Sequence, residues 1–234
     1  MVEESLTRVV QKLVEDDTSI QDALNRGYAN ISALARLLKP KIEEIIEGKV
    51  NISGVITALR RVRERLKPLR GENLKIIANS VISIRTDLAK ISIEKTRKNL
   101  EKARTLPTKF PETFFQVLEG IGTLTLIVDQ RVYNEVRLKF REDEIIDEKL
   151  DLAAIIIQSP KEIVETPGCI AEFYGALARK GINVEETVSC STETIIVLDT
   201  RDSLRAYSIL MDLIGEYRGK MNTLKILRPP PHAP

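Results

Sequence analysis

The fold of the C-terminal third is decided by residues 166–184, which read TPGCIAEFYGALARKGINV. Pro167-Gly168 is a turn pair at which a helix can begin. The apolar residues that follow predict a helix that runs to Lys180. Gly181 is expected to end it, because glycine readily takes the left-handed conformation found after helix C-termini. The stretch therefore predicts one helix that leads directly into a strand.

Apolar runs of strand length lie on both sides of this helix. The elements expected between residues 150 and 228 are strands at Leu152–Gln158, Val184–Ser189, Thr194–Asp199 and Leu224–Leu227, with a second helix at Ser203–Tyr217. In chain order this is β-α-β-β-α-β, the split βαβ or ferredoxin-like pattern. We therefore expect an antiparallel α+β domain over residues 150–228.

Residues 74–147 also mix helix and strand. Two hairpins are expected there, which turn at Arg85-Thr86-Asp87 and at Asp129-Gln130-Arg131. Between them, residues 95–104 read as a charged helix. The region is therefore predicted to be a separate α+β domain, and a degenerate copy of the C-terminal domain is one alternative for it.

The first 70 residues read as helices throughout. Asn30-Ile31-Ser32 and Asn51-Ile52-Ser53 each offer N-cap side chains before an apolar run. Pro40 is expected to interrupt the helix that begins at Asn30. Residues 67–73, where Pro, Gly and Asn cluster, read as a linker. We expect a helical domain over residues 1–70, with a helix-turn-helix and a plain bundle as the two alternatives.

The composition sets limits on the class of protein. The 234 residues, 43% of them hydrophobic, suffice for two or three small domains, and the net charge of +2 does not suggest a polyanion binder as a whole. No export signal is apparent, and no apolar run approaches the 18 residues of a membrane span. We expect a cytoplasmic protein without a membrane partner.

Catalytic chemistry lacks its usual residues. The one histidine, His232, stands in the Pro-rich tail 229–234, which is expected to be extended and flexible and so a poor place for oriented proton transfer. The two cysteines, Cys169 and Cys190, have no metal-ligand spacing, and no nucleotide-binding glycine motif is present. We therefore expect no enzyme, no catalytic residue, no cofactor and no metal.

Residues 166–184 resemble an ACT domain and are most similar to those in the regulatory half of aspartokinases. That family has a Pro-Gly or similar turn, a helix with apolar and small residues in this order, and then Gly-Ile-Asn/Ser-Val. The resemblance continues through Ser189-Cys190-Ser191 to the strand that ends at Asp199, and it covers about a third of the chain. The glycine-rich and lysine motifs that aspartokinase catalysis needs are not found upstream.

The resemblance implies a mechanism. ACT domains pair with their sheets side by side, and many bind a free amino acid at the seam, with the ligand carboxylate on backbone N–H groups at a helix start. The implied site residues are Thr166, Gly168, Cys169, Ile170 and Ala171 at the helix start, with Asn183, Val184, Glu185, Ser189 and Ser191 on a partner strand. Thr166 and Ser191 replace the acids that the family commonly has, and a pair that only dimerises is the alternative.

A basic stretch ends the helical region. Residues 60–70 carry six cations and one acid, and Arg60, Arg61 and Arg63 are the residues expected to contact DNA phosphates. The alternative is the solvated face of a small helical bundle, or a surface that docks the other domains. The sequence thus predicts an amino-acid-sensing transcriptional regulator, at least a dimer. A non-catalytic subunit that docks on an amino-acid biosynthetic enzyme is the second candidate.

Overall fold

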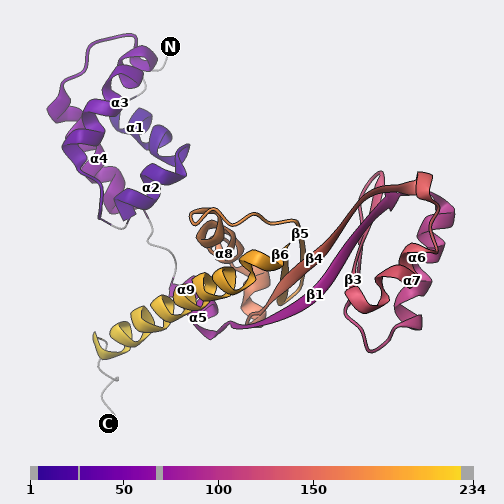
Figure 1. Ribbon diagram of the computed structural model, residues 1–234. Coiled ribbons are helices and arrows are strands. Elements are labelled where there is room, and N and C mark those ends of the chain that lie inside the picture. The colour runs from indigo at the N-terminus through magenta and orange to yellow at the C-terminus, as the bar shows by residue number, and fades with distance from the viewer. Residues whose placement is uncertain (1–4, 26, 67–70, 228–234) are drawn as a thin grey trace. The chain divides into compact units, whose positions relative to one another are not determined.

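The computed structural model describes residues 5–25, 27–66 and 71–227, and the expected tail lies outside this range. The chain divides after Gly71 into two compact units, each considered by itself (Figure 1). The first is helical, and the second combines helices with one antiparallel sheet. The predicted α+β class, helices first and then an antiparallel sheet, is confirmed.

The helical unit packs its helices around one apolar core. The helices are α1 (Leu6–Glu15), α2 (Thr18–Asn25), α3 (Ile31–Ile46) and α4 (Ile52–Arg65). Asn30 Oδ1 accepts hydrogen bonds from two backbone N–H groups at the start of α3, and Asn51 Oδ1 accepts one at the start of α4. The repeated Asn-Ile-Ser tripeptide is thus the same N-cap used twice.

The sequence predicted that Pro40 interrupts its helix, and this prediction was wrong. It lies inside α3 on an exposed side, between the buried Leu38 and Ile42. Core packing on both sides of Pro40 offsets the hydrogen bond that proline cannot donate. The helix-turn-helix alternative for this unit stays a prediction.

The second unit is built on six strands in the order β2-β3-β1-β4-β6-β5, and every neighbouring pair is antiparallel. The strands are β1 (Val81–Glu94), β2 (Phe115–Glu119), β3 (Thr123–Asp129), β4 (Ile145–Gln158), β5 (Glu186–Cys190) and β6 (Glu193–Asp199). The helices are α5 (Gly71–Asn79), α6 (Arg97–Lys109), α7 (Tyr133–Arg137), α8 (Cys169–Ala178) and α9 (Thr200–Leu227), with short 3₁₀ turns η1 (Gln130–Val132), η2 (Glu142–Glu144) and η3 (Lys161–Glu165).

This strand order reads the same from both ends when β1 is exchanged with β4, β2 with β5 and β3 with β6. Half A is residues 88–94 of β1 with α6, β2, β3, α7 and residues 145–150 of β4. Half B is residues 152–158 of β4 with α8, β5, β6, α9 and residues 81–85 of β1. Half A has the split βαβ order along the chain. Half B has the same strand arrangement in space, but its edge strand, residues 81–85, comes first in the chain and not last. Strands β1 and β4 run through both halves.

A sequence repeat marks the relation between the halves. Asp87-Leu88-Ala89 begins the part of β1 in half A, and Asp151-Leu152-Ala153 begins the part of β4 in half B. Both aspartates have a positive φ, 57° and 55°. Leu88 pairs with Asp129 in β3, and Leu152 pairs with Asp199 in β6. Since Leu88 and Leu152 also pair with each other, the halves meet at a pseudo-two-fold centre between these two leucines.

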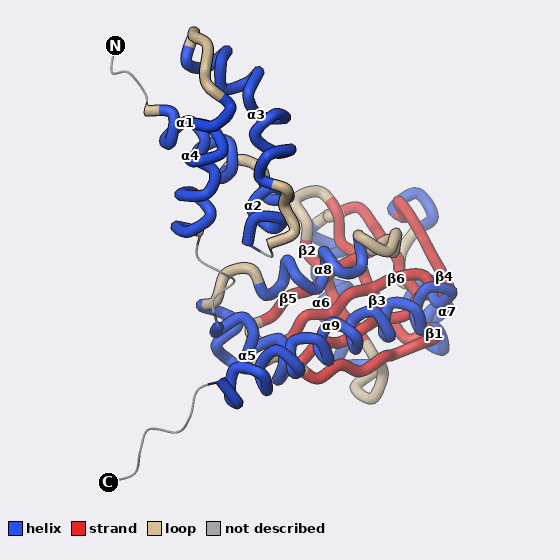
Figure 2. Tube along the Cα trace, turned by 90° about the vertical axis from the view of Figure 1, so that its left-hand side faces the viewer, coloured by secondary structure: helices blue, strands red, loops and turns tan. Residues whose placement is uncertain are grey.

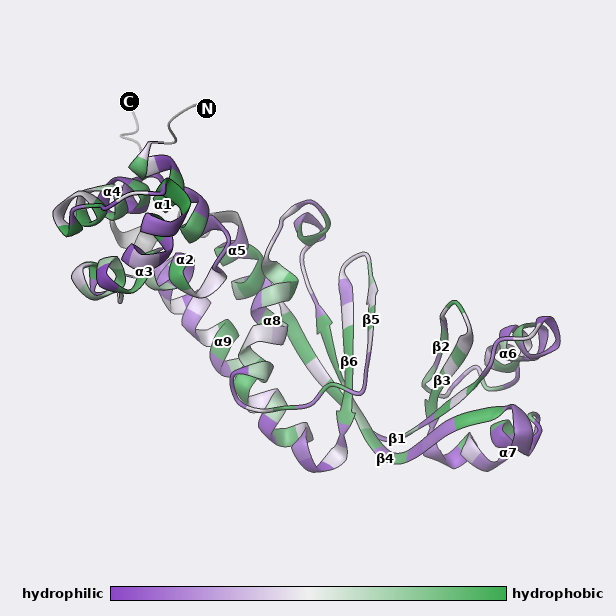
Figure 3. Ribbon diagram, turned by 90° about the horizontal axis from the view of Figure 1, so that it is seen from above, coloured by the Kyte–Doolittle hydropathy of each residue, from purple (hydrophilic) through white to green (hydrophobic). Residues whose placement is uncertain are grey.

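Helices cover the outer face of each half. Helices α8 and α9 pack on half B, and α6 and α7 pack on half A. Figure 3 shows that the inner faces of the halves turn toward each other, with no helix between them. A separate apolar cluster lies where the inner faces of the two halves meet. Its buried members, all at most 3% exposed, are Leu88, Ile127, Leu152, Ala154, Ile195 and Val197. The sheet therefore has buried residues on both faces near the centre.

Both predicted hairpin turns were wrong. Residues 85–87 lie inside β1, where the left-handed Asp87 forms a bulge in the pairing with β4. Residues 129–131 do not join two strands. Asp129 Oδ1 accepts the backbone N–H of Arg131 at 3.1 Å and caps η1, which leads into α7. Polar side chains suit a bulge or a helix cap as well as a turn, and non-local strand pairing decides among them.

Two further elements differ from the sequence prediction. Leu224–Leu227 belongs to α9 and is not a strand, because residues 81–85 of β1 already fill the place beside β4 where that strand was expected. Residues 76–84 were expected to form the first strand of the first hairpin, but residues 76–79 belong to α5, which Figure 2 shows beside α9. The boundary expected between residues 147 and 150 falls inside β4.

The central leucines give a direct test of this arrangement. Leu152→Ala removes a fully buried side chain from the cluster between the halves. We predict a loss of about 2–5 kcal/mol in the free energy of unfolding, measured by urea titration. Leu204→Ala is the control, because Leu204 is 77% exposed and should change stability by less than about 0.5 kcal/mol. Equal effects of the two changes would contradict a shared core at Leu152.

Candidate functional site

The start of α8 is the feature that the sequence singled out. Gly168 is its N-cap residue with φ 93°, a conformation that side chains with a Cβ rarely adopt. No side chain caps this helix. Gly168 and Ala171 are exposed and Ile170 is half-buried. Backbone N–H groups at this end are therefore available to an acceptor from outside, and the helix dipole favours an anion there.

Cys169 lies differently from its neighbours. The residue is fully buried in the core under α8 and α9. Burial raises the pKa of the Cys169 thiol, which disfavours the reactive thiolate. Its amide is buried with it, so Gly168, Ile170 and Ala171 carry the backbone N–H groups at the helix start that a ligand can approach.

Asn73 is the residue that sequence reasoning missed. It lies in α5 and is 3% exposed, and its Nδ2 donates to the carbonyl of Pro167 at 2.8 Å. A Cβ on Gly168 would come within 3.1 Å of this Nδ2. Its Oδ1 is buried and has no hydrogen-bond partner among the described residues. A buried acceptor without a donor costs free energy, so this oxygen beside α8 is a candidate ligand contact.

An open cleft of about 490 Å³ lies next to these residues, between α5 and η3. Its lining includes Lys75 from α5 and Glu162, Glu165 and Thr166 from the η3 segment. The hydroxyl of Thr166 donates to the carbonyl of Glu162 at 2.7 Å, so its proton is already used. The cleft offers charges of both signs, as a zwitterion requires.

Two of the expected partner residues, Ser189 and Ser191, are exposed. Ser189 is in β5, and Ser191 is in the turn that joins β5 to β6. The N–H of Ser159, on the way from β4 to α8, donates to the carbonyl of Thr192 in the same turn at 2.8 Å. These serines therefore lie at the end of half B where the chain leads into α8.

The other three, Asn183, Val184 and Glu185, precede β5 at the opposite end of half B. The N–H of Glu185 donates to the carbonyl of Val197 at 2.8 Å, and its carboxylate accepts from Lys149 at 2.5 Å. One chain therefore does not bring all the expected residues into one site. The partner strand that the resemblance implies would therefore have to supply one of the two groups.

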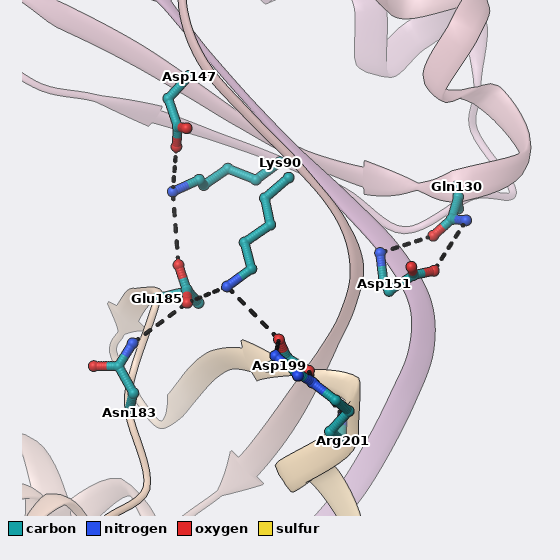
Figure 4. A network of polar contacts seen from close by, with 9 residues as sticks. Lys90, Gln130, Asp147, Asp151, Asn183, Glu185, Asp199 and Arg201 are labelled. Atoms are coloured by element: carbon teal, nitrogen blue, oxygen red, sulfur yellow. Dashed lines mark hydrogen bonds and ion pairs between the residues drawn. The ribbon is translucent and has the colours of Figure 1, made fainter.

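Glu185 belongs to a network that joins the halves (Figure 4). The Lys90 ammonium, on a side chain 10% exposed, lies 2.9 Å from Asp147 and 3.9 Å from Glu185. Lys149 reaches Asp199 at 3.7 Å, and Arg201 pairs with Asp199 at 2.8 Å. Cations and carboxylates alternate here, so the network is a structural link and leaves no charge for a ligand.

These ion pairs shift the pKa of two carboxyl groups. Hydrogen bonds from Arg201 hold the pKa of Asp199 well below its ordinary value. The hydrogen bond from Lys90 lowers the pKa of Asp147. The same hydrogen-bonded Asp-x-Arg arrangement is found in half A, where Arg131 lowers the pKa of Asp129. The paired positions in the two halves thus use the same electrostatics.

The residues expected to contact DNA, Arg60, Arg61 and Arg63, are exposed on α4 in the helical unit. Lys67 and Arg70, which extend the basic stretch, lie outside the described residues, as does His232. Among the side chains that the structure describes, no group of three or more His, Cys, Asp or Glu could hold a metal ion. Within the same residues, no helix is long and apolar enough to cross a membrane.

No protein-family model matches this chain, and no curated protein does. Solved structures do match it. The regulatory subunit of aspartate kinase from Thermus thermophilus is 16% identical, with a TM-score of 0.47, over 56% of this chain and 94% of that one. A putative C-terminal regulatory domain of aspartate kinase from Porphyromonas gingivalis is 14% identical, with a TM-score of 0.44, over 58% and 96%.

Aspartate kinase from Synechocystis is 18% identical, with a TM-score of 0.48, over 59% of this chain and 27% of that longer one. The three structures named here are an aspartate kinase and two regulatory portions of aspartate kinases. Identities this low and TM-scores below 0.5 say nothing of the ligand or partner of this chain.

The backbone at Gly168 can be tested with a single methyl group. Gly168→Ala places a Cβ in a left-handed conformation and within 3.1 Å of Asn73. We predict a loss of about 1–3 kcal/mol in the free energy of unfolding, measured by urea titration. Gly215→Ala is the matched control, because Gly215 is inside α9 with open space around it. It should stabilise the protein by up to about 1 kcal/mol. Changes of the same sign would contradict the geometry at Gly168.

The ion pairs predict how stability depends on pH. A carboxyl group whose pKa is lower in the folded than in the unfolded state stabilises the fold above the unfolded value, about 3.9 for Asp. This contribution is lost as the pH falls through the lower folded value. Asp199→Asn should therefore weaken the fall in stability between about pH 5 and pH 2, measured by denaturant titration. Asp212→Asn, at an exposed site with no ion pair among the described residues, is the control and should leave the fall unchanged.

Proposed function

We propose that this protein is a non-enzymatic regulator that senses a free amino acid through the sheet unit. The observation that carries the proposal is the buried, unpartnered Oδ1 of Asn73 beside the uncapped start of α8. The Asn73 oxygen can accept a hydrogen bond from the ammonium group of an amino acid, and the backbone N–H groups of α8 can donate to its carboxylate. The two groups of the ligand are bonded to the same carbon, so an acceptor and donors this close together suit it.

The ligand carboxylate would accept from the backbone N–H groups at the start of α8. Gly168 has no side chain to keep the ligand away, and Ile170 and Ala171 follow in the first turn. Lys75 of the adjacent cleft adds a cation on the same side of the domain. This arrangement combines the helix-terminus preference for anions with a charge-assisted contact.

The ammonium group of the ligand would donate to Asn73 Oδ1, with Glu165 as the nearby carboxylate. Glu165 lines the cleft beside Thr166, the position where the family commonly has an acid. Asn73 would need a small shift to expose its oxygen, since the residue is 3% exposed. The bond that it donates to Pro167 ties such a shift to the backbone at the start of α8.

The remaining contacts would come from a second ACT unit. A homodimer that pairs half B with an ACT unit of the other chain could place Asn183 and Val184, or the hydroxyls of Ser189 and Ser191, against the start of α8, while Glu185 keeps its ion pair with Lys149. Ligand binding would then favour one arrangement of the pair, as regulation requires. The cytoplasm stays the predicted compartment.

The helical unit would carry the output, and DNA is the partner that we propose for it. The exposed arginines of α4 support this candidate. The second candidate is a regulatory subunit that docks on a biosynthetic enzyme. The exposed apolar residues Tyr28 and Leu37 of this unit support it, because apolar side chains are common in protein interfaces. Binding to DNA that weakens with salt would favour the first candidate over the second.

Thermal melting of the full chain with each of the twenty amino acids tests the sensing proposal. A ligand at 100 times its dissociation constant adds about 2.7 kcal/mol of stability, which raises the melting temperature by about 5–10 °C. Lys75→Gln should reduce the shift for the amino acid that binds, because it removes the cation from the cleft. Lys161→Gln, an exposed change on η3 outside the cleft lining, is the control.

Two results would count against the site. If no amino acid raises the melting temperature, sensing fails and a purely structural ACT pair is left. If an amino acid raises the melting temperature by the same amount in wild type, Lys75→Gln and Gly168→Ala, the protein senses that amino acid but binds it at another site.

A further inference from the structure

A basic groove runs between α1 and α4 in the helical unit. One side of each helix is buried in the common core, through Val9 and Leu13 of α1 and Leu59 and Val62 of α4. The flanks of the same helices hold Arg8 and Lys12 and, on α4, Arg61 and Arg65. Each pair is spaced four residues apart, so both members lie on the same side of their helix. The four cations line one open groove of about 750 Å³.

Among the residues that the structure describes, these charges have no ion-pair partner. Of the described carboxylates, none forms an ion pair with Arg8, Lys12, Arg61 or Arg65, although ion pairs are frequent elsewhere in the chain. Glu15 is the acidic member of the groove lining, and the amide of Gln11 donates to it at 2.8 Å. Four like charges on adjacent helices repel one another unless an anion lies between them.

The first turn of α1 adds to the same preference. Ser5 is the N-cap residue and lines the groove, yet its side chain makes no capping hydrogen bond. The described first turn of α1 carries no acidic residue. No described acidic residue in this turn therefore offsets the positive end of the helix dipole beside the groove.

The lining identifies the class of anion. Every residue of the groove is polar, and beside the cations it offers Ser5, Thr7 and Gln11. Arginine, lysine, serine, threonine and glutamine side chains are those that contact phosphate and sugar oxygens of DNA. A protein interface would need an apolar centre, and a membrane surface would need apolar residues to insert. Neither is present in the groove lining.

We propose that this groove binds the sugar–phosphate backbone of duplex DNA, with Arg8, Lys12, Arg61 and Arg65 as the phosphate contacts. The proposal rests on DNA being the output of the helical unit and names the surface that makes the contact. Of the three arginines expected from the sequence, Arg61 lines the groove, whereas Arg60 and Arg63 are exposed but outside its lining. The affinity is then set by residues from two helices far apart in sequence.

The test is fluorescence anisotropy of the full chain with a labelled DNA duplex of about two helical turns. Four phosphate contacts predict a slope of about −3.6 in log affinity against log salt, so affinity falls on the order of 100-fold between about 50 and about 200 mM salt. Arg61→Gln/Arg65→Gln and Arg8→Gln/Lys12→Gln should each weaken binding and make the slope less steep by about 2. All four residues are exposed, and circular dichroism checks that the variants fold.

Arg36→Gln/Lys41→Gln is the matched control, with the same charge change at exposed positions of α3 in the same unit but outside the groove lining. It should leave the slope unchanged. If the control loses as much affinity as the groove variants, or if the groove variants bind like wild type, the groove is not the contact surface, while DNA as the partner stands. If wild type does not bind the duplex even at the lower salt, DNA as the output fails and the groove proposal fails with it. The amino-acid melting experiment decides separately whether sensing survives.

Discussion

The pairing of β1 with β4 is the constraint on which the sheet unit depends. Both strands have 14 residues, far longer than the other four, and each contributes to both halves of the sheet. The pairing is irregular at the centre, where Asp87 and Asp151 adopt left-handed conformations on either side of Leu88 and Leu152. These irregularities bend the two strands, so the inner faces of the halves can bury one common cluster. Neither half has a complete sheet without both strands.

The candidate site includes a residue from α5, the first helix of the sheet unit. Helix α5 follows residues 67–70 and leads directly into β1. Asn73 in α5 holds the carbonyl of Pro167, and Arg218 of α9 donates to the carbonyl of Ala78 near the end of α5 at 2.7 Å. A ligand at the start of α8 would therefore act on the helix that begins the sheet unit.

The local sequence was informative wherever nearby residues set the structure. Gly168 predicted a special backbone conformation at the start of α8, and Asn30 and Asn51 predicted the starts of α3 and α4. The apolar runs at 152–158 and 194–199 predicted strands that are present in β4 and β6. Capping and turn chemistry act over three or four residues, so they can be read from one segment.

Long-range pairing was not readable in the same way. Residues 81–85 belong to half B through their pairing with residues 154–158, and no local pattern indicates a partner so distant. Asn73 looked like part of a linker, because Gly71 and Asn73 are common in loops. The groove of the helical unit combines residues 8 and 12 with 61 and 65, which become neighbours through the packing of α1 on α4. The repeated Asp-Leu-Ala was visible in the sequence, but its meaning depends on the sheet.

Native-state hydrogen exchange of the backbone amides in β1 and β4 tests most directly whether these strands unite the halves. The account predicts that amides on both sides of Leu88 and Leu152 exchange through one common opening, with the same free energy and the same dependence on denaturant. Amides of half A that open at a distinctly lower free energy than those of half B would contradict it, because the halves would then be separate folding units that share only a connection.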